Sequence, residues 1–289
     1  MDNALDINRI AVVGAGQMGS GIAHICAANG FVTDLCDVDE ARAGVARARI
    51  ANSLENATRK GRLTPEAAAQ ALARIHTTTL DEALAQADLV IEAVTEDPKL
   101  KASLFTRIDG AARPDVVIAS NTSSIPIASL AAHTQRAAQV IGMHFMNPVP
   151  VMQLVEVVVS EHTSAATRDT ICALAQRLGK TVVLSQDRAG FIVNRVLIPL
   201  LIEACLALEE GVASAQDIDT GIRLGLNHPM GPLALADLIG LDTVLAIAEV
   251  MQHGLGNDKY APPKILRDLV AAGNLGRKTG RGFYTYDTR

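Results

Sequence analysis

A glycine-rich turn between an apolar strand and a helix is the feature that most restricts the fold. In RIAVVGAGQMGSG, the apolar run predicts a buried strand over 10–13, and a helix follows over 18–28. Gly14 permits a tight turn, Gly16 lets a pyrophosphate approach the backbone, and Gly19 lets the helix pack close to the strand. This arrangement is typical of dinucleotide-binding α/β folds.

An acidic residue at the end of the next predicted strand extends the pattern. Asp37 follows the strand 31–36 and lies 18 residues after Gly19, where a carboxylate that binds ribose hydroxyls belongs. We therefore predict an NAD site, with NAD preferred because Asp37 would repel the 2′-phosphate of NADP. Arg42, one turn further on, could accommodate that phosphate, so the strength of the preference stays open.

Strands and helices alternate through the first two thirds of the chain. Further apolar runs predict strands over 89–93, 116–120, 140–143, 154–159 and 181–184. The alternation predicts an α/β fold with a Rossmann-type doubly wound, mostly parallel sheet. Strand 154–159 follows 140–143 too closely for a helical crossover, so we expect that pair to be antiparallel.

No strand pattern recurs after Phe191 until the final few residues. Helices are predicted instead over 191–210, 214–224, 231–253 and 263–272. We therefore expect two domains, a dinucleotide-binding domain at 1–187 and an all-α domain at 188–289.

A helical hairpin at about 40–75 interrupts the alternation. It combines helix 39–60 with a second helix that starts at Pro65, which is more chain than a crossover requires. Its basic residues either solvate the helices or form an arm for a phosphate-bearing substrate, and the residues alone leave both possibilities open. These residues are Arg47, Arg49, Arg59, Lys60 and Arg62.

Composition disfavours several other functions. The net charge is −5 without a basic run, which argues against nucleic acid as a partner. The first residues lack the apolar core of a signal peptide, and acidic residues interrupt the longest apolar stretch, 233–251, so we expect no membrane segment. The four cysteines have no metal-type spacing, so we expect four buried free thiols, no metal and a cytoplasmic location. They are Cys26, Cys36, Cys172 and Cys205.

A carboxylate within a predicted buried strand points to chemistry. Glu156 lies inside LVEVVV, where it needs a partner, and His144 ends the preceding strand twelve residues earlier. The bend FMNPVP can return the chain and bring the two side chains together. A carboxylate on one ring nitrogen would orient the imidazole as a general base and stabilise its cation. A structural bond at the sheet edge is the alternative, but the nearby dinucleotide site favours catalysis.

Two further polar positions carry less information. Ser123, in NTSS, follows the strand 116–120, and Asn194 lies in the first helix of the second domain. Each could contact a substrate, but Ser123 could equally belong to a helix cap and Asn194 could bond a backbone carbonyl.

Several stretches together resemble one family over nearly the whole chain. They are VVGAGQMGSGIA, VIEAVTED, ASNTSSIPI, GMHFMNPVPVMQLVEVV, DRAGFIVNR, NHPMGPLALADLIGLD and GRKTGRGFYTY. The chain in this way resembles the short, monofunctional 3-hydroxyacyl-CoA dehydrogenases, including the 3-hydroxybutyryl-CoA type.

The resemblance implies an NAD-dependent dehydrogenase in which His144 and Glu156 are the catalytic pair. Ser123 and Asn194 are implied to contact the 3-oxygen region of the substrate, and the hairpin to hold CoA through Lys60. At Asn56, however, some relatives carry lysine, so the CoA phosphate contacts stay open. A homodimer through the helical domain is also implied. The implied cofactor-binding residues are Gly14, Gly16, Gln17, Met18, Gly19, Asp37, Glu96, Lys101, Ser123, Asn147 and Lys278.

Two other functions remain as alternatives. An L-gulonate 3-dehydrogenase has similar motifs but binds no CoA, and a crystallin-like relative would bind the dinucleotide without catalysis. The intact pair of His144 and Glu156 argues against the second alternative.

Overall fold

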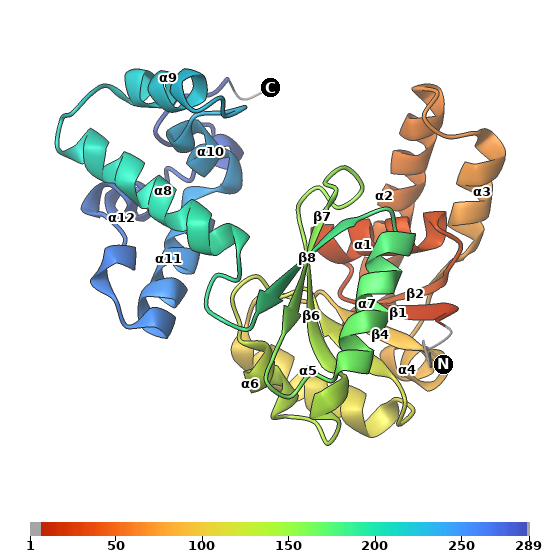
Figure 1. Cartoon of the computed structure of the whole chain (residues 1–289). Helices are drawn as coiled ribbons and strands as arrows, with labels where there is room; N and C mark the ends of the chain where they lie inside the picture. Colours follow the sequence, from red (N-terminus) through yellow and green to blue (C-terminus); the bar gives the residue numbers. More distant parts are fainter. Residues whose placement is uncertain (1–6, 288–289) are drawn as a thin grey trace. The chain divides into compact units, whose positions relative to one another are not determined.

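The computed structural model describes residues 7–287 and divides the chain into two compact units, Met1–Asp187 and Arg188–Arg289. The first unit is built around one large sheet, and the second is built from helices (Figure 1). Within residues 7–287, no helix is both long and apolar enough to cross a membrane.

The sheet of the first unit has the strand order β3-β2-β1-β4-β5-β6-β7-β8. Neighbouring strands are parallel except for the antiparallel pair β6–β7, which confirms the predicted fold class and the predicted reversal. The strands are β1 (Arg9–Val13), β2 (Val32–Cys36), β3 (Ile75–Thr77), β4 (Leu89–Glu92), β5 (Val117–Ser120), β6 (Val140–Phe145), β7 (Leu154–Val159) and β8 (Thr181–Gln186).

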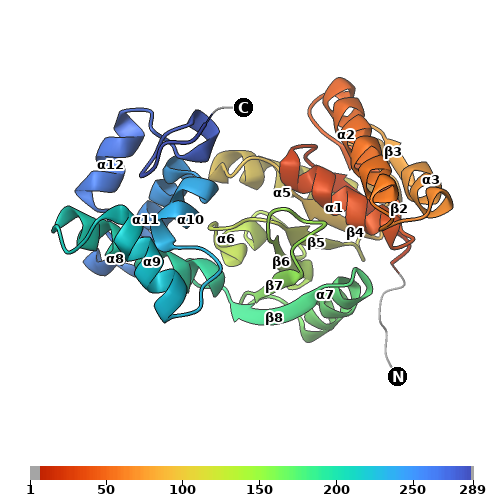
Figure 2. The same cartoon turned by 90° about the horizontal axis from the view of Figure 1, so that it is seen from above.

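Helices cover both faces of this sheet (Figure 2). On one face, helices α1 and α7 pack with the strands into one continuous apolar core. Helices α4, α5 and α6 cover the opposite face of the sheet. The helices of this unit are α1 (Gln17–Ala28), α2 (Glu40–Arg59), α3 (Pro65–Ala73), α4 (Leu80–Gln86), α5 (Pro98–Ala111), α6 (Ile127–Ala131), the 3-10 turn η1 (Ala137–Gln139) and α7 (Ala165–Arg177).

Three details of the sequence prediction are wrong. Helix α3 ends at Ala73, and the next residues form the short edge strand β3, whose His76 and Thr77 are exposed and give no apolar run. The single helix expected over 231–253 is two helices, because Gly240 adopts a φ of 103° that ends the first of them. Cys172 is half-buried, although the other three thiols are buried.

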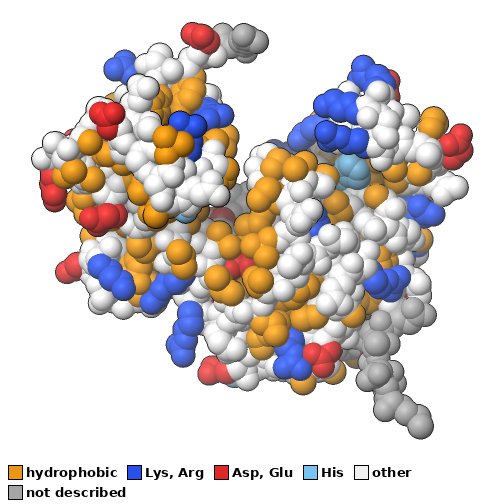
Figure 3. All heavy atoms as spheres, turned by 45° about the horizontal axis from the view of Figure 1, so that its top comes forward, with side chains coloured by type: hydrophobic (Ala, Val, Ile, Leu, Met, Phe, Trp, Pro, Cys, Tyr) orange, Lys and Arg blue, Asp and Glu red, His pale blue; other side chains and the backbone are white. Residues whose placement is uncertain are grey.

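Helices α2 and α3 form the hairpin beside α1. Asp39 caps α2 and Thr64 caps α3, each by accepting a backbone N–H of the first turn. Basic side chains gather over the far end of the hairpin (Figure 3). Arg47 does not belong to this group, because its guanidinium donates to the carbonyl oxygens of Leu72 and Ile75 and ties α2 to the edge strand.

The second unit is all helical in residues 188–287, apart from isolated bridges at 276, 281 and 285. Its apolar core lies mainly between α8, α11 and α12. The elements are α8 (Val193–Glu209), α9 (Ala215–Gly225), α10 (Pro232–Ile239), α11 (Leu241–Leu255), η2 (Asp258–Tyr260), α12 (Lys264–Ala271) and η3 (Arg277–Thr279).

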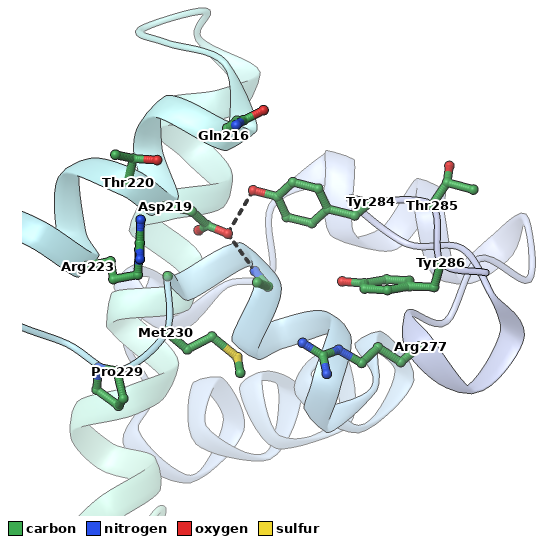
Figure 4. Close-up of a pocket in the computed structure, with 12 residues that line it drawn as sticks. Gln216, Asp219, Thr220, Arg223, Pro229, Met230, Arg277, Tyr284, Thr285 and Tyr286 are labelled. Atoms are coloured by element: carbon green, nitrogen blue, oxygen red, sulfur yellow. Dashed lines mark hydrogen bonds between the residues drawn. The ribbon is translucent and has the colours of Figure 1, made fainter. Parts of the chain in front are cut away.

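Two buried carboxylates organise this unit. Asp237 in α10 accepts the backbone N–H groups of Phe283 and Tyr284 at 3.0 Å and the hydroxyl of Tyr286 at 2.9 Å. Asp219 in α9 caps α10 and accepts the Tyr284 hydroxyl at 2.8 Å (Figure 4). A cavity of about 390 Å³ lies beside these residues. The late segment 283–286 is therefore an integral part of the helical unit.

Candidate active site

The glycine-rich turn after β1 has no room for a side chain at two of its three glycines, Gly14 and Gly19. Gly14 has a φ of 106°, and a Cβ on it would lie 2.6 Å from the carbonyl oxygen of Ala93. A Cβ on Gly19 would lie 1.7 Å from the carbonyl oxygen of Gly14, so α1 and β1 approach as closely as backbone allows. A Cβ on Gly16 would meet no atom within 4 Å, so bare backbone there faces open space.

A cavity of about 630 Å³ opens beside this turn and extends past the end of β2. Asp37 lies in its wall and accepts the N–H groups of Ala15 and Val38, both at 2.7 Å. The carboxylate is therefore fixed at the carboxyl end of β2, where the ribose of a dinucleotide binds. The Arg42 guanidinium lies 3.9 Å from it with a side chain that is 68% exposed.

Two predicted cofactor residues meet although they lie far apart in the sequence. The Gln17 amide at the start of α1 donates to the Asn147 side-chain oxygen at 3.1 Å. Met18 is partly buried against the apolar core of the sheet. The turn after β1 and the loop after β6 thus form one continuous edge.

His144 and Glu156 are directly opposed in the antiparallel pair β6–β7. His144 Nδ1 lies 2.7 Å from Glu156 Oε2. Glu156 is fully buried and His144 is 8% exposed. A carboxylate on Nδ1 fixes the tautomer and orientation of the ring, so Nε2 is the nitrogen that would exchange a proton with a substrate. The geometry suits a general base with an orienting carboxylate.

Glu96 holds the loop after β5 that contains Ser123. Its Oε1 accepts the hydroxyls of Thr122 and Ser124 at 2.6 and 2.9 Å and the Ser123 N–H at 2.8 Å. The Ser123 hydroxyl lies 3.2 Å from the same oxygen. Burial works against ionisation of Glu96, but the ammonium of Lys101 and these hydrogen bonds outweigh it and lower the pKa of the carboxyl.

The same loop is tied to the strand that carries His144. The side-chain oxygen of Asn121 accepts the backbone N–H of Phe145, the residue after His144, at 2.9 Å. The NTSS segment and the candidate base are therefore positioned by one shared contact.

Sequence reasoning missed a buried carboxylate in this region. Glu92 ends β4 and bonds Lys101 Nζ at 2.6 Å, with both side chains almost wholly buried. Lys101 thus lies inside a polar cluster behind the cavity wall. A signal was present, since Glu92 closes the apolar run LVIE, where a carboxylate needs partners.

Two predicted residues belong to the helical unit. Asn194 is largely buried in the first turn of α8. Lys278 Nζ lies 2.5 and 2.6 Å from the two carboxylate oxygens of Asp242. Their roles toward substrate and cofactor stay predictions.

Comparison with known proteins decides the family. The model of the 3-hydroxyacyl-CoA dehydrogenase NAD-binding domain matches residues 9–188, and that of the C-terminal domain of the same family matches residues 190–286. The chain belongs to the 3-hydroxyacyl-CoA dehydrogenase family. The predicted resemblance and the predicted NAD cofactor are thereby confirmed, and the chain is an NAD-dependent oxidoreductase.

Relatives in this family are similar over their whole length. A probable 3-hydroxybutyryl-CoA dehydrogenase of Deinococcus radiodurans is 49% identical, covering 96% of this chain and 100% of the relative. The 3-hydroxybutyryl-CoA dehydrogenase of Bradyrhizobium diazoefficiens is 46% identical, covering 97% and 96%. The crystal structure of (S)-3-hydroxybutyryl-CoA dehydrogenase from Ralstonia eutropha has a TM-score of 0.96 and 48% identity, covering 98% and 100%.

Asp37 is expected to set the preference for NAD. Asp37→Ala should reduce the ratio of kcat/KM for NAD over NADP by roughly one to two orders of magnitude, because a charged acceptor is lost and a repulsion is removed. Arg42→Ala is the matched control and should leave the ratio unchanged or raise it. Equal efficiency of the wild type with both cofactors would contradict this assignment.

His144 and Glu156 are expected to act as one unit. His144→Gln should lower turnover by about two to four orders of magnitude and leave the dissociation constant of NADH near that of the wild type. Glu156→Gln should also lower turnover, because the charge that stabilises the imidazolium is lost.

A double-mutant cycle tests their coupling. The turnover of the double variant, with both His144→Gln and Glu156→Gln, should be little lower than the turnover of His144→Gln alone. A loss of turnover in the double variant equal to the product of the two single losses would show that Glu156 acts separately from His144. Wild-type turnover of His144→Gln would rule out His144 as the base.

Proposed function

We propose that this chain interconverts L-3-hydroxyacyl-CoA and 3-oxoacyl-CoA, with 3-hydroxybutyryl-CoA as substrate. The observation that carries the proposal is the His144–Glu156 pair on the antiparallel strands β6 and β7 of an NAD-binding domain. The similar proteins from Deinococcus, Bradyrhizobium and Ralstonia bear the name of this activity, which supports the choice of substrate.

Proton transfer is assigned to the histidine. Bound NAD supplies the acceptor for the hydride that leaves C3. His144 takes the proton of the 3-hydroxyl, and Glu156 stabilises the resulting imidazolium at the 2.7 Å contact with Nδ1. Burial of both side chains strengthens this interaction, because little water screens it.

Substrate positioning is assigned to Ser123 and Asn194. Ser123 would contact the 3-oxygen from the loop that Glu96 holds, and Asn194 would do so from α8. The implied cofactor contacts of Glu96, Lys101, Asn147 and Lys278 belong to the same proposal.

The helical hairpin is assigned to the CoA phosphates. Arg59, Lys60 and Arg62 are exposed on and just after α2, where basic side chains gather (Figure 3). The Arg59 guanidinium donates to the side-chain oxygen of Asn56. Asn56, the position at which some relatives carry lysine, therefore orients this guanidinium. Phosphate groups favour such clustered cations.

A homodimer through the helical unit and a cytoplasmic location complete the proposal. Exposed apolar side chains on and between the helices, including Val212, Leu224 and Leu226 at 59–70% exposure, support burial against a second copy. A monomeric molar mass in light scattering at micromolar concentration would contradict the dimer.

Oxidation of NADH tests the activity. Acetoacetyl-CoA should be reduced with loss of absorbance at the NADH band, and L-gulonate with NAD should give no comparable rate. Turnover of L-gulonate alone would establish the alternative dehydrogenase, and no turnover of either substrate would leave the non-catalytic alternative.

The hairpin assignment is tested with substrates that differ in the nucleotide. Lys60→Ala should raise the KM for acetoacetyl-CoA by roughly two- to fivefold, the effect of one exposed ion pair. It should leave the KM for the pantetheine-truncated substrate unchanged, because that substrate lacks the nucleotide phosphates. Lys264→Ala, at an exposed lysine of α12, is the control. Equal effects of Lys60→Ala on both substrates would mean that the hairpin is only structural.

A further inference from the structure

Glu92 is fully buried at the carboxyl end of β4, between the ends of β1 and β5. Its Oε1 accepts the Val94 N–H at 2.7 Å and Lys101 Nζ at 2.6 Å, and its Oε2 accepts the Ser120 hydroxyl at 2.6 Å. Ser120 Oγ accepts the Thr122 N–H, and the Ser120 hydroxyl donates to Glu92. Each of these three partners is a donor, which suits the two acceptor oxygens of a carboxylate.

Lys101 connects Glu92 to a second carboxylate. Its side chain is 1% exposed, and its ammonium also lies 3.3 Å from Glu96 Oε2. Two carboxylates therefore share one ammonium, and the cluster of Glu92, Lys101 and Glu96 has a net charge of −1. Glu92 and Lys101 are removed from water, so the field of this part of the cluster is weakly screened, whereas the Glu96 side chain is 34% exposed.

The cluster lies directly behind the dinucleotide site. Ala93, Val94 and Thr95 follow Glu92 and form part of the wall of the 630 Å³ cavity. Asp37 marks the adenosine end beyond β2, and the strand order continues from β2 through β1 to β4 and β5. A dinucleotide laid across this crevice has its nicotinamide half over the ends of β4 and β5.

We propose that Glu92 is a positioning residue that sets the relative affinity for the two redox forms of the cofactor. It fixes Lys101 and, through Lys101, Glu96, and it supplies the negative charge of the cluster. The oxidised nicotinamide ring is a cation and the reduced ring is neutral. The cluster therefore stabilises bound NAD⁺ relative to bound NADH.

The test compares the dissociation constants of NAD⁺ and NADH, measured by direct titration without substrate. Glu92→Gln keeps the size of the side chain and removes its charge. The ratio Kd(NAD⁺)/Kd(NADH) should rise by roughly 4- to 20-fold, the effect of one charge over about 10 Å at an effective dielectric constant of 20–40. Unchanged affinities, or equal losses for both forms, would overturn the proposal.

Glu92→Asp is the matched control, because it keeps the charge and disturbs the contacts. It should weaken both forms in similar proportion and leave the ratio near that of the wild type. A ratio that shifts as much in Glu92→Asp as in Glu92→Gln would overturn the role of charge.

If Glu92→Gln does not fold, a second variant tests whether the charge of the cluster sets the ratio of the two dissociation constants. Glu96→Gln removes the same charge from a side chain that is 34% exposed, and the ratio should again rise. A ratio within twofold of the wild type in this folded variant would overturn the proposal. Because no acyl-CoA is present, the outcome is independent of the proposed substrate.

Discussion

The antiparallel pairing of β6 with β7 is the constraint on which the candidate active site depends. The reversal places Glu156 opposite His144, and a slip of one residue would turn the carboxylate to the other face. Close packing supports the register, because a Cβ on Gly142 would lie 2.7 Å from the Cβ of Val158. Lys180 also holds the return loop through the carbonyl oxygens of Val149 and Met152, at 2.6 and 2.7 Å.

The sequence predicted those parts of the molecule whose physical signals are local. Apolar runs marked the buried strands, and the carboxylate in LVEVVV required a partner that only a neighbouring strand end offered. The edge strand β3 gave no such signal, because two of its three residues are exposed. The break at Gly240 was hidden between two apolar stretches, since its φ of 103° is a property of the folded chain. Glu92 was missed because its donors Lys101 and Ser120 come from other elements.

Carboxylates in strands and just after them recur through the first unit. Asp37 after β2, Glu92 at the end of β4 and Glu156 in β7 each accept hydrogen bonds from groups that the adjoining loops or strands would otherwise leave unsatisfied. The cost of burying these charges is offset by donors from neighbouring segments, so the loops around the cofactor site are fixed before any ligand arrives. The preformed edge explains how residues distant in sequence, such as Gln17 and Asn147, come into contact.

Asp237 has a consequence for how the protein is made. This buried carboxylate in α10 takes its donors from Phe283, Tyr284 and Tyr286, more than forty residues later in the chain. During synthesis the sheet unit can fold as soon as β8 has emerged, whereas the helical unit cannot bury Asp237 with its donors until translation has passed Tyr286. The nascent chain therefore contains every residue of the first unit before it contains the donors that complete the second.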